Sequence, residues 1–236
     1  MKMSGNTILI TGGATGIGYA MAKYFLARGN AVIICGRRAD RLDQAAKSLP
    51  GVHTAKCDAA DASGRHALLA HIQDKFPDMN ILINNAGIQR DIDLTRGVSD
   101  LESGEDEIKI NLEAPIMLSA LFTPQLSGKD NAAIVNVSSG LAFMVEKAAR
   151  TPVYCAAKAG MHAFSIAQRI QLSPIGIRVV ELIPPMVESE LNIESRRKRN
   201  MVTSPNMMPA DEYVEKTFDK MEQGIDEIKL EVNWRR

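Results

Sequence analysis

The stretch Thr7-Ile-Leu-Ile-Thr-Gly-Gly-Ala-Thr-Gly-Ile-Gly18 lies near the start of the chain and indicates its fold class. Its first five residues are a short, mostly apolar run, which predicts a strand buried on both faces of a parallel sheet. Glycines follow at positions 12, 13, 16 and 18, and a helical pattern begins directly after them. A strand, a glycine turn and a helix in this order predict the first half of a βαβ unit.

The same alternation continues along the 236-residue chain. It predicts further strands at 31–35, 52–57, 79–84, 132–137, 177–183 and 227–232, the last of them a weak edge strand. Helices are expected after the first two strands and at 61–76, 101–126, 152–172 and 210–223, and Pro115 could interrupt the one at 101–126. Such repetition predicts an α/β fold of the Rossmann type. Its doubly wound parallel sheet would carry helices on both faces, in a single domain covering residues 1–236.

Charge and composition limit the classes of partner. The formal net charge is zero, so bulk charge gives no argument for nucleic acid or an anionic membrane surface. The apolar runs are shorter than a membrane span, and the N-terminus leads into the first strand without room for a signal peptide. The three cysteines have no metal-ligand spacing, and their odd number suits a reduced compartment. We therefore expect a cytoplasmic protein that binds no metal, nucleic acid or membrane.

Tyr154 and Lys158 lie four residues apart in the predicted helix at 152–172, so both side chains project from one face. An ammonium beside a phenol lowers the pKa of the tyrosine, which suits it to act as a general acid or base. Lowering that pKa to about 7 needs roughly 4 kcal/mol, which requires the help of a bound cationic cofactor. Such a pair also arises by chance in many helices, so its meaning depends on the rest of the chain.

The glycine turn after the first strand is suited to bind a nucleotide. Glycines let the backbone approach a ligand, and the N-terminus of the following helix favours a pyrophosphate. The spacing is Gly-x-x-x-Gly-x-Gly, which differs from the Gly-x-Gly-x-x-Gly of the common dinucleotide fingerprint. The alternative is a glycine turn that holds no ligand.

The end of the second strand indicates which nicotinamide cofactor the chain prefers. NAD-binding folds commonly place a carboxylate there, where it holds the adenosine 2′-hydroxyl. This chain has Arg37 and Arg38 instead, and two guanidinium groups suit a 2′-phosphate. The pattern predicts NADP(H) as the preferred cofactor and NAD(H) as the second option. A solvated arginine pair without a ligand is the alternative.

Together these features resemble the short-chain dehydrogenase/reductase family, in its compact single-domain form, over nearly the whole chain. The motifs that carry the resemblance occur in the family's order, at residues 11–18, 57–58, 84–87, 111, 135–139, 154–158 and 184–189. Within the family the chain is most similar to the DltE-type oxidoreductases, through residues 33–37, 120–124, 139–143, 152–155 and 184–187. The resemblance implies hydride transfer between a small-molecule carbonyl or alcohol and the cofactor.

The resemblance also implies a role for each residue of the catalytic motif. Tyr154 would be the general acid/base, and Lys158 would lower its pKa and bind the nicotinamide ribose. Ser139, rather than its neighbour Ser138, would stabilise the charge that develops on the substrate oxygen. Asn111 would hold a water that links Lys158 to solvent. Taken singly, the serine and the asparagine would be ordinary capping or turn residues.

The implied cofactor contacts run from the adenine to the nicotinamide. Asp58 and Ala59 would meet the adenine, and the three residues after the fourth strand would line the adenosine ribose. Val187 and Ser189 would meet the nicotinamide end. The complete set is Gly12, Thr15, Gly16, Ile17, Gly18, Arg37, Arg38, Asp58, Ala59, Asn85, Ala86, Gly87, Tyr154, Lys158, Val187 and Ser189.

Three departures from the family pattern concern the surroundings of the site. Fifteen positions separate Ser139 from Tyr154, so residues 145–151 are expected to bulge as a loop beside it. Pro185 stands where the family usually has glycine, and it removes a backbone donor. The C-terminal region, which in relatives often contributes to subunit contacts, is short.

Residues 186–209 are expected to form a substrate lid. This segment contains the basic stretch 196–199, which is either a solvated face, a patch for nucleic acid or another anion, or a feature that favours acidic substrates. Two functions compete: an NADP(H)-dependent oxidoreductase, and a non-enzymatic NADP(H)-binding redox sensor or scaffold. The presence of all four residues of the catalytic motif argues for the enzyme.

The sequence also predicts self-association. In the family, the helix that ends near residue 126 and the tyrosine helix commonly pack against a two-fold mate. Here they carry apolar residues that look exposed: Met117, Leu121, Phe122 and Met161. We expect a homodimer or homotetramer.

Overall fold

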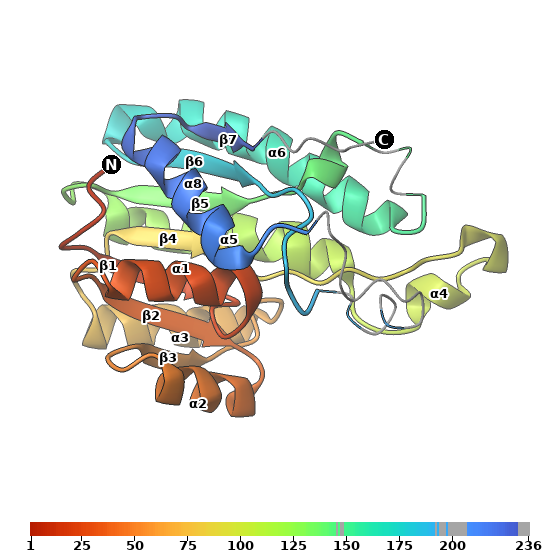
Figure 1. The fold of residues 1–236 in the computed structure, drawn as a ribbon, viewed down its shortest axis with the longest axis horizontal. Helices are drawn as coiled ribbons and strands as arrows, with labels where there is room; N and C mark the ends of the chain where they lie inside the picture. The colour runs from red at the N-terminus through yellow and green to blue at the C-terminus, as the bar shows by residue number, and fades with distance from the viewer. Residues whose placement is uncertain (145, 147–148, 192, 194–196, 198–206, 231–236) are drawn as a thin grey trace.

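A computed structural model describes residues 1–144, 146, 149–191, 193, 197 and 207–230. Seven strands form one sheet in the order β3-β2-β1-β4-β5-β6-β7, and each neighbouring pair is parallel. The chain moves outward from β1 to β3, returns past β1 to β4 and continues in the opposite direction to β7 (Figure 1). This confirms the doubly wound Rossmann-type sheet expected from the alternating pattern.

The bounds of the elements follow the sequence patterns closely. The strands are β1 (Thr7–Thr11), β2 (Ala31–Gly36), β3 (His53–Lys56), β4 (Ile81–Asn84), β5 (Ala133–Val137), β6 (Arg178–Ile183) and β7 (Glu227–Lys229). The helices are α1 (Gly16–Leu26), α2 (Ala39–Ser48), α3 (Ala62–Lys75), α4 (Ser99–Glu102), α5 (Ala114–Leu126), α6 (Pro152–Leu172) and α8 (Ala210–Glu222). Short helical turns complete them: η1 (Leu94–Arg96), η2 (Lys109–Glu113), η3 (Gly140–Ala142) and η5 (Ser173–Ile175).

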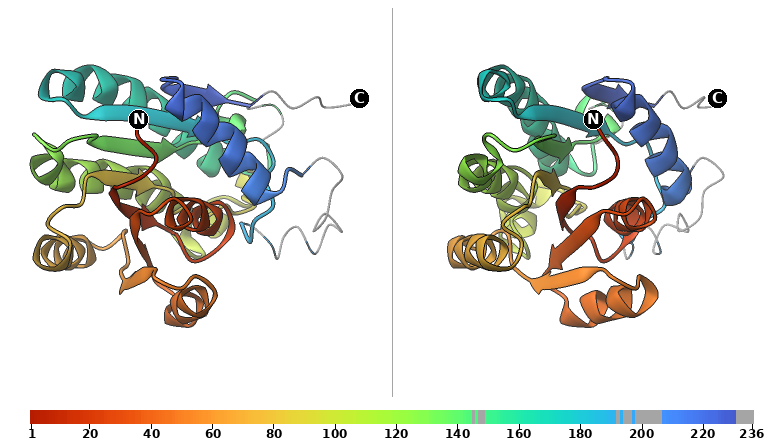
Figure 2. Two further views of the ribbon diagram at one scale, coloured as in Figure 1. Left: turned by 60° about the vertical axis from the view of Figure 1, so that its left-hand side comes forward. Right: turned by 90° about the vertical axis from the view of Figure 1, so that its left-hand side faces the viewer.

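Helices cover both faces of the sheet, as the two views of Figure 2 show. On one face α1, α2 and α8 pack against Ile8 and Ile10 of β1, and on the other α3 and α5 pack against Leu9. Successive side chains of a strand point to opposite faces, so a strand covered on both sides must be apolar at every position. This is why Ile8, Leu9 and Ile10 form a continuous run, and all three are fully buried.

The stretch 101–126 differs from the single helix expected. Helix α4 ends at Glu102, and Gly104 then takes a φ of +110°, a backbone conformation that stops a helix. A π-helical turn, η2, leads into α5. Pro115 stands in the first turn of α5, where its missing N–H leaves no hydrogen bond unmade, so it starts the helix rather than interrupting it.

The interpretation of the apolar residues on α5 and α6 needs correction. Phe122 and Met161 are buried within the chain's own core, so they cannot offer a surface to a second copy. Met117 is 40% exposed, as expected. The three cysteines are free and buried, so they pack as small apolar residues. Among the described residues, no helix is both long and apolar enough to cross a membrane.

Candidate functional site

The predicted site residues gather at one edge of the sheet, because parallel strands bring their carboxyl ends together. The glycine turn follows β1, the arginines follow β2, residues 85–87 follow β4, Ser139 follows β5, and Val187 and Ser189 come after β6. Helix α6 supplies Tyr154 and Lys158, and η2 supplies Asn111. These groups form two neighbouring regions. We call residues 12–18, 37–38, 58–59 and 85–87 the adenosine end, and Asn111, Ser139, Tyr154 and Lys158 the catalytic end.

The glycine turn requires glycine for steric reasons. Gly12 has a φ of +64°, and a Cβ there would lie 2.8 Å from the Cα of Ala86. A Cβ on Gly18 would lie 2.4 Å from the carbonyl oxygen of Gly12. Helix α1 begins at Gly16, with Thr15 at its N-cap and Ile17 in its first turn. The turn therefore presents open backbone at a helix N-terminus, the arrangement that favours a phosphate group.

Residues 85–87 are tied directly to this turn. The Asn85 side-chain amide donates to the carbonyl oxygens of Thr11 and Gly12, at 2.9 and 3.2 Å. The Thr11 hydroxyl in turn accepts from the backbone N–H groups of Asn85 and Ala86, both at 3.0 Å. The part of the sequence expected to line the adenosine ribose thus lies beside the part expected to hold the pyrophosphate.

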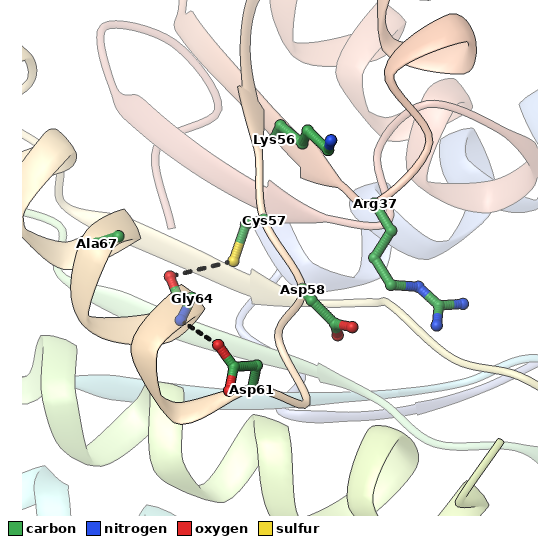
Figure 3. A pocket seen from close by; sticks show the side chains of 7 residues that line it. All are labelled: Arg37, Lys56, Cys57, Asp58, Asp61, Gly64 and Ala67. Carbon is green, nitrogen blue, oxygen red and sulfur yellow. Dashed lines mark hydrogen bonds between the residues drawn. The ribbon is translucent and has the colours of Figure 1, made fainter.

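A cavity of about 380 Å³ lies between the ends of β2 and β3 and the start of α3 (Figure 3). Arg37 and Asp58 line it, together with Cys57 and Gly64. Asp58 accepts from the Ala60 N–H at 3.0 Å, and the carbonyl of Ala59 accepts from Arg65 at 2.8 Å. The cavity stands where the sequence predicts the adenine and the 2′-substituent of its ribose.

Arg37, which lines this cavity, and the adjacent Arg38 both have carboxylate partners that the sequence did not reveal. Arg37 forms an ion pair with Glu105, which raises the pKa of the guanidinium. Arg38 contacts Glu190 at 3.1 Å, and Arg41 contacts the same carboxylate at 3.0 Å. The side chains of the first two arginines are 41% and 55% exposed, so these pairs lie in solvent.

At the catalytic end, Asn111 is fully buried in the π-helical turn. Its side chain accepts from the N–H of Ile88 at 2.9 Å and donates to the carbonyl of Ile88 at 2.8 Å. This pair of bonds holds the loop that follows Gly87. A Cβ on Gly87 would lie 2.9 Å from Asn111 Oδ1 and 3.7 Å from Lys158 Nζ. The asparagine and the lysine therefore approach the same backbone position.

Ser139, Tyr154 and Lys158 converge from two elements. Ser139 caps η3, and its hydroxyl accepts from the N–H of Leu141 at 3.2 Å. Tyr154 and Lys158 are 5% and 4% exposed on α6. The ammonium of Lys158 donates to the carbonyl of Val137 at 2.8 Å and lies 5.8 Å from the centroid of the tyrosine ring. The two side chains thus share one helix face, as the four-residue spacing predicts.

Burial dominates the ionisation of this pair. It raises the pKa of Tyr154 to about 12; a hydrogen bond with Ser139 lowers that pKa, and the charge of Glu107 raises it. Burial also lowers the pKa of Lys158 to about 8. The side chains of the protein do not by themselves bring the tyrosine pKa down, because the lysine is committed to Val137 rather than to the phenol. That a bound cationic cofactor lowers this pKa stays a prediction.

Ser138 points away from the tyrosine, into a polar pair that the sequence analysis missed. Its hydroxyl donates to Glu181 at 2.5 Å, and the second oxygen of that carboxylate lies 2.8 Å from Nδ1 of His162. Glu181 is fully buried in β6. An acidic residue inside the apolar run 178–183 was the available signal, since a buried carboxylate needs partners.

The loops around the site join one another. Val187 forms a parallel bridge with Met208, so the two ends of the segment 186–209 lie together. A Cβ on Gly16 would lie 3.1 Å from Cβ of Ser189, which places that serine against the glycine turn. In the expected loop 145–151, the carbonyl of Arg150 accepts from the N–H of Ile92 at 2.9 Å. Most of the basic stretch 196–199 lies outside the described residues; Arg197 is exposed.

The chain is similar to known proteins over most of its length. The family model described as short chain dehydrogenase matches residues 6–200. The "Uncharacterized oxidoreductase DltE" of Bacillus subtilis (strain 168) is 47% identical over 231 residues, covering 98% of this chain and 90% of the relative. A serine 3-dehydrogenase of Agrobacterium fabrum is 34% identical over 206 residues, covering 87% of this chain and 80% of the relative. The solved structure of a short-chain dehydrogenase from Sphingobium yanoikuyae in complex with NADPH superimposes with a TM-score of 0.82 at 27% identity, covering 94% and 86% of the two chains.

Proposed function

Because the chain belongs to the short-chain dehydrogenase/reductase family and resembles its DltE-type members, we propose that it is an NADP(H)-dependent oxidoreductase that interconverts a small-molecule carbonyl and alcohol. The convergence of Ser139, Tyr154 and Lys158 at the carboxyl end of the sheet is the observation that carries the proposal. A relative with 34% identity is named a serine 3-dehydrogenase, which supports chemistry at a hydroxyl group.

The residues present fit a nicotinamide dinucleotide. The glycine turn leaves backbone uncovered at the start of α1, where a pyrophosphate would lie. The cavity lined by Asp58 would receive the adenine, residues 85–87 would line its ribose, and Val187 and Ser189 would meet the nicotinamide end. When bound, this cofactor supplies the hydride acceptor or donor.

The residues of the catalytic end handle the proton and the charge. Tyr154 gives a proton to the substrate oxygen in reduction and takes it back in oxidation. Ser139 donates a hydrogen bond to the same oxygen and stabilises the charge that develops there. Lys158 would bind the nicotinamide ribose, and the positive charge of the oxidised cofactor, when bound, would add to that of the ammonium in favouring the phenolate of Tyr154. Asn111 holds the loop at Ile88 and, through a water, relays protons from Lys158.

The preference for NADP(H) rests on Arg37 and Arg38. Their carboxylate partners do not prevent phosphate binding, because exposed ion pairs contribute only about 0–1 kcal/mol. A 2′-phosphate offers a doubly charged group with three acceptor oxygens, so it can replace a single carboxylate at either guanidinium. Both arginines directly follow β2, where NAD-preferring folds place an acid, and Arg37 lines the cavity.

Titration of the purified protein with NADPH and NADH, followed by nicotinamide fluorescence, tests this preference. We expect NADPH to bind more tightly than NADH, and Arg37→Ala to weaken NADPH by about 10-fold or more while leaving NADH unchanged. A preference for NADH would overturn the cofactor assignment. Binding of cofactor without turnover of any carbonyl would overturn the enzymatic assignment and favour a redox sensor.

The remaining proposals concern the location and the assembly. The substrate lid expected at 186–209 lies mostly outside the described residues. We propose that the protein works in the cytoplasm. We also propose that it is a homodimer or homotetramer that associates through α5 and α6. These helices expose Met117, Ile166 and Ile170, which are 40%, 39% and 73% accessible. Sedimentation velocity at micromolar concentration tests the assembly, and a monomer would contradict it.

A further inference from the structure

A second cavity, of about 340 Å³, lies between the segment 101–108 and the first turn of α6. Val153 is part of its wall, and this residue directly precedes Tyr154. The opposite wall contains Glu107, which lies four residues before Asn111. The cavity is therefore bordered by the elements that carry two residues of the catalytic end. Its volume is within the range of pockets that hold small molecules.

Glu107 is an unusual component of such a wall. The residue is only 1% exposed. Its Oε1 atom accepts from the N–H of Arg90 at 3.0 Å, whereas Oε2 is buried and has no hydrogen-bond partner in the described part of the chain. Burial raises the pKa of this carboxyl. A buried oxygen without a donor is costly, so it indicates a group that the protein binds from outside.

The other charged groups at this wall are already engaged. The guanidinium of Arg90 donates to the backbone carbonyls of Asp100, Ser103 and Glu105. Asp106 accepts from the N–H of Lys109 at 3.0 Å. The charge of Arg90 lowers the pKa of Glu107 and that of Asp106 raises it, but neither side chain donates a hydrogen bond to the free oxygen. Two carboxylates, Asp106 and Glu107, and one guanidinium line the cavity, so its charged groups sum to a net negative charge.

Glu107 also acts on the catalytic tyrosine. Its charge is one of the causes that raise the pKa of Tyr154, which places the two side chains within electrostatic reach of each other. A ligand that occupies the cavity and neutralises Glu107 is thus close to the group that exchanges a proton with the substrate. A cation there removes a negative charge that opposes the phenolate.

We propose that Glu107 binds a protonated amine on the substrate, so that the enzyme acts on amino alcohols and the corresponding amino-carbonyl compounds. This inference rests on the proposed function and adds the substrate class to it. An ammonium offers three donors and a full positive charge, and it forms a charge-assisted hydrogen bond with a carboxylate. A substrate carboxylate at the same place would meet like charge. The inference therefore opposes an acidic substrate.

Three alcohols that share one skeleton provide the test. Isopropanolamine, propylene glycol and lactate carry an ammonium, a hydroxyl and a carboxylate beside the same secondary alcohol. Their affinities are measured by calorimetry with and without NADPH, since an alcohol and the reduced cofactor cannot react together. We expect isopropanolamine to bind at least about 10-fold more tightly than propylene glycol, and lactate to bind most weakly.

Glu107→Gln tests whether the charge of Glu107, rather than its hydrogen bond to the backbone, recognises the amine. Glutamine keeps an oxygen for the N–H of Arg90 but loses the charge, so the advantage of the amine should disappear. Glu102→Gln removes an exposed carboxylate from the neighbouring helix α4 and should leave the advantage intact. In the wild type, the advantage should grow as the pH rises through the raised pKa of Glu107, because the carboxyl then becomes charged.

The outcomes distinguish this inference from the proposed function. Equal affinity for the amine and the diol in the wild type overturns the inference, and so does an amine advantage that survives Glu107→Gln. The comparison of the three alcohols in the wild type does not depend on whether a variant folds. Turnover of the same alcohols with NADP⁺ is measured separately. Selective amine binding without turnover would support the site while overturning the enzymatic function.

Discussion

The adenosine end and the catalytic end are built in opposite ways. At the first, Arg37 and Arg38 are exposed and held by single carboxylates, Glu105 and Glu190. At the second, the four residues are at most 9% exposed and are held by backbone groups and by one another. Exposed ion pairs contribute little and are easily exchanged, whereas buried hydrogen bonds fix the position of a side chain.

This difference follows the task of each end. A cofactor phosphate brings its own charge, so the protein needs only adaptable cations at the adenosine end. At the catalytic end the charge develops during the reaction, so the donors must be in place beforehand. Four substitutions test this difference between the two ends, and they follow in order of decreasing expected effect.

Tyr154→Phe should produce the largest effect. We expect kcat to fall by about 10²–10⁴-fold, because the general acid/base is lost while the ring remains. The dissociation constant of NADPH should change little, since the phosphate contacts lie at the other end. Steady-state kinetics and fluorescence titration measure the two quantities. Tyr24→Phe, which removes a phenol from α1, is the matched control, and an equal loss of kcat in both variants would contradict the assignment.

Gly18→Ala tests the close packing at the adenosine end. The new Cβ would lie 2.4 Å from the carbonyl oxygen of Gly12 and 2.5 Å from Nδ2 of Asn85, so the turn must shift. We expect a loss of about 1–3 kcal/mol in the free energy of unfolding, together with weaker cofactor binding. Gly36→Ala is the control, because its Cβ would meet nothing within 4 Å. Urea denaturation of both variants measures the difference, and equal stability would refute the steric argument.

Lys158→Met tests burial at the catalytic end through pH. The lysine has a pKa of about 8 in the folded protein, against a usual value of 10.5. Between these values the unfolded chain binds a proton that the folded protein does not, so folding stability rises with pH. Between about pH 8 and pH 9.5, the free energy of unfolding of the wild type should rise by about 2 kcal/mol relative to that of the variant. Urea denaturation at a series of pH values measures this free energy for both proteins. If the two curves of free energy against pH run parallel, the pKa of Lys158 is not lowered in the folded protein.

Glu190→Gln should produce the smallest effect, which is an increase in the affinity for NADPH. Removing the carboxylate frees Arg38 and Arg41, so NADPH should bind about 2- to 5-fold more tightly while NADH binding stays the same. The fluorescence titration proposed for Arg37→Ala measures both. Weaker NADPH binding would mean that Glu190 positions the arginines rather than competing with the phosphate.

Local sequence predicted the framework of this protein well. The apolar run 7–11, the glycines after it and the Tyr154–Lys158 spacing depend on backbone periodicity, which neighbouring residues determine. The helix Pro152–Leu172 and the parallel doubly wound sheet followed from such patterns. The glycine motif predicted a turn with open backbone, and the structure has one.

Interactions between distant residues depended on the tertiary structure. The helix expected at 101–126 stops after Glu102, and Gly104 follows with a φ of +110°. The carbonyls on either side of this glycine, of Ser103 and Glu105, accept from the distant Arg90. The ion pairs of Arg37 and Arg38 join residues 68 and 152 positions apart. Burial is the largest cause of the shifted pKa values of Tyr154 and Lys158. Burial also leaves Oε2 of Glu107 without a hydrogen-bond donor in the described part of the chain. Periodicity is a local property of the chain, whereas burial and the pairing of charges exist only once remote segments have been brought together.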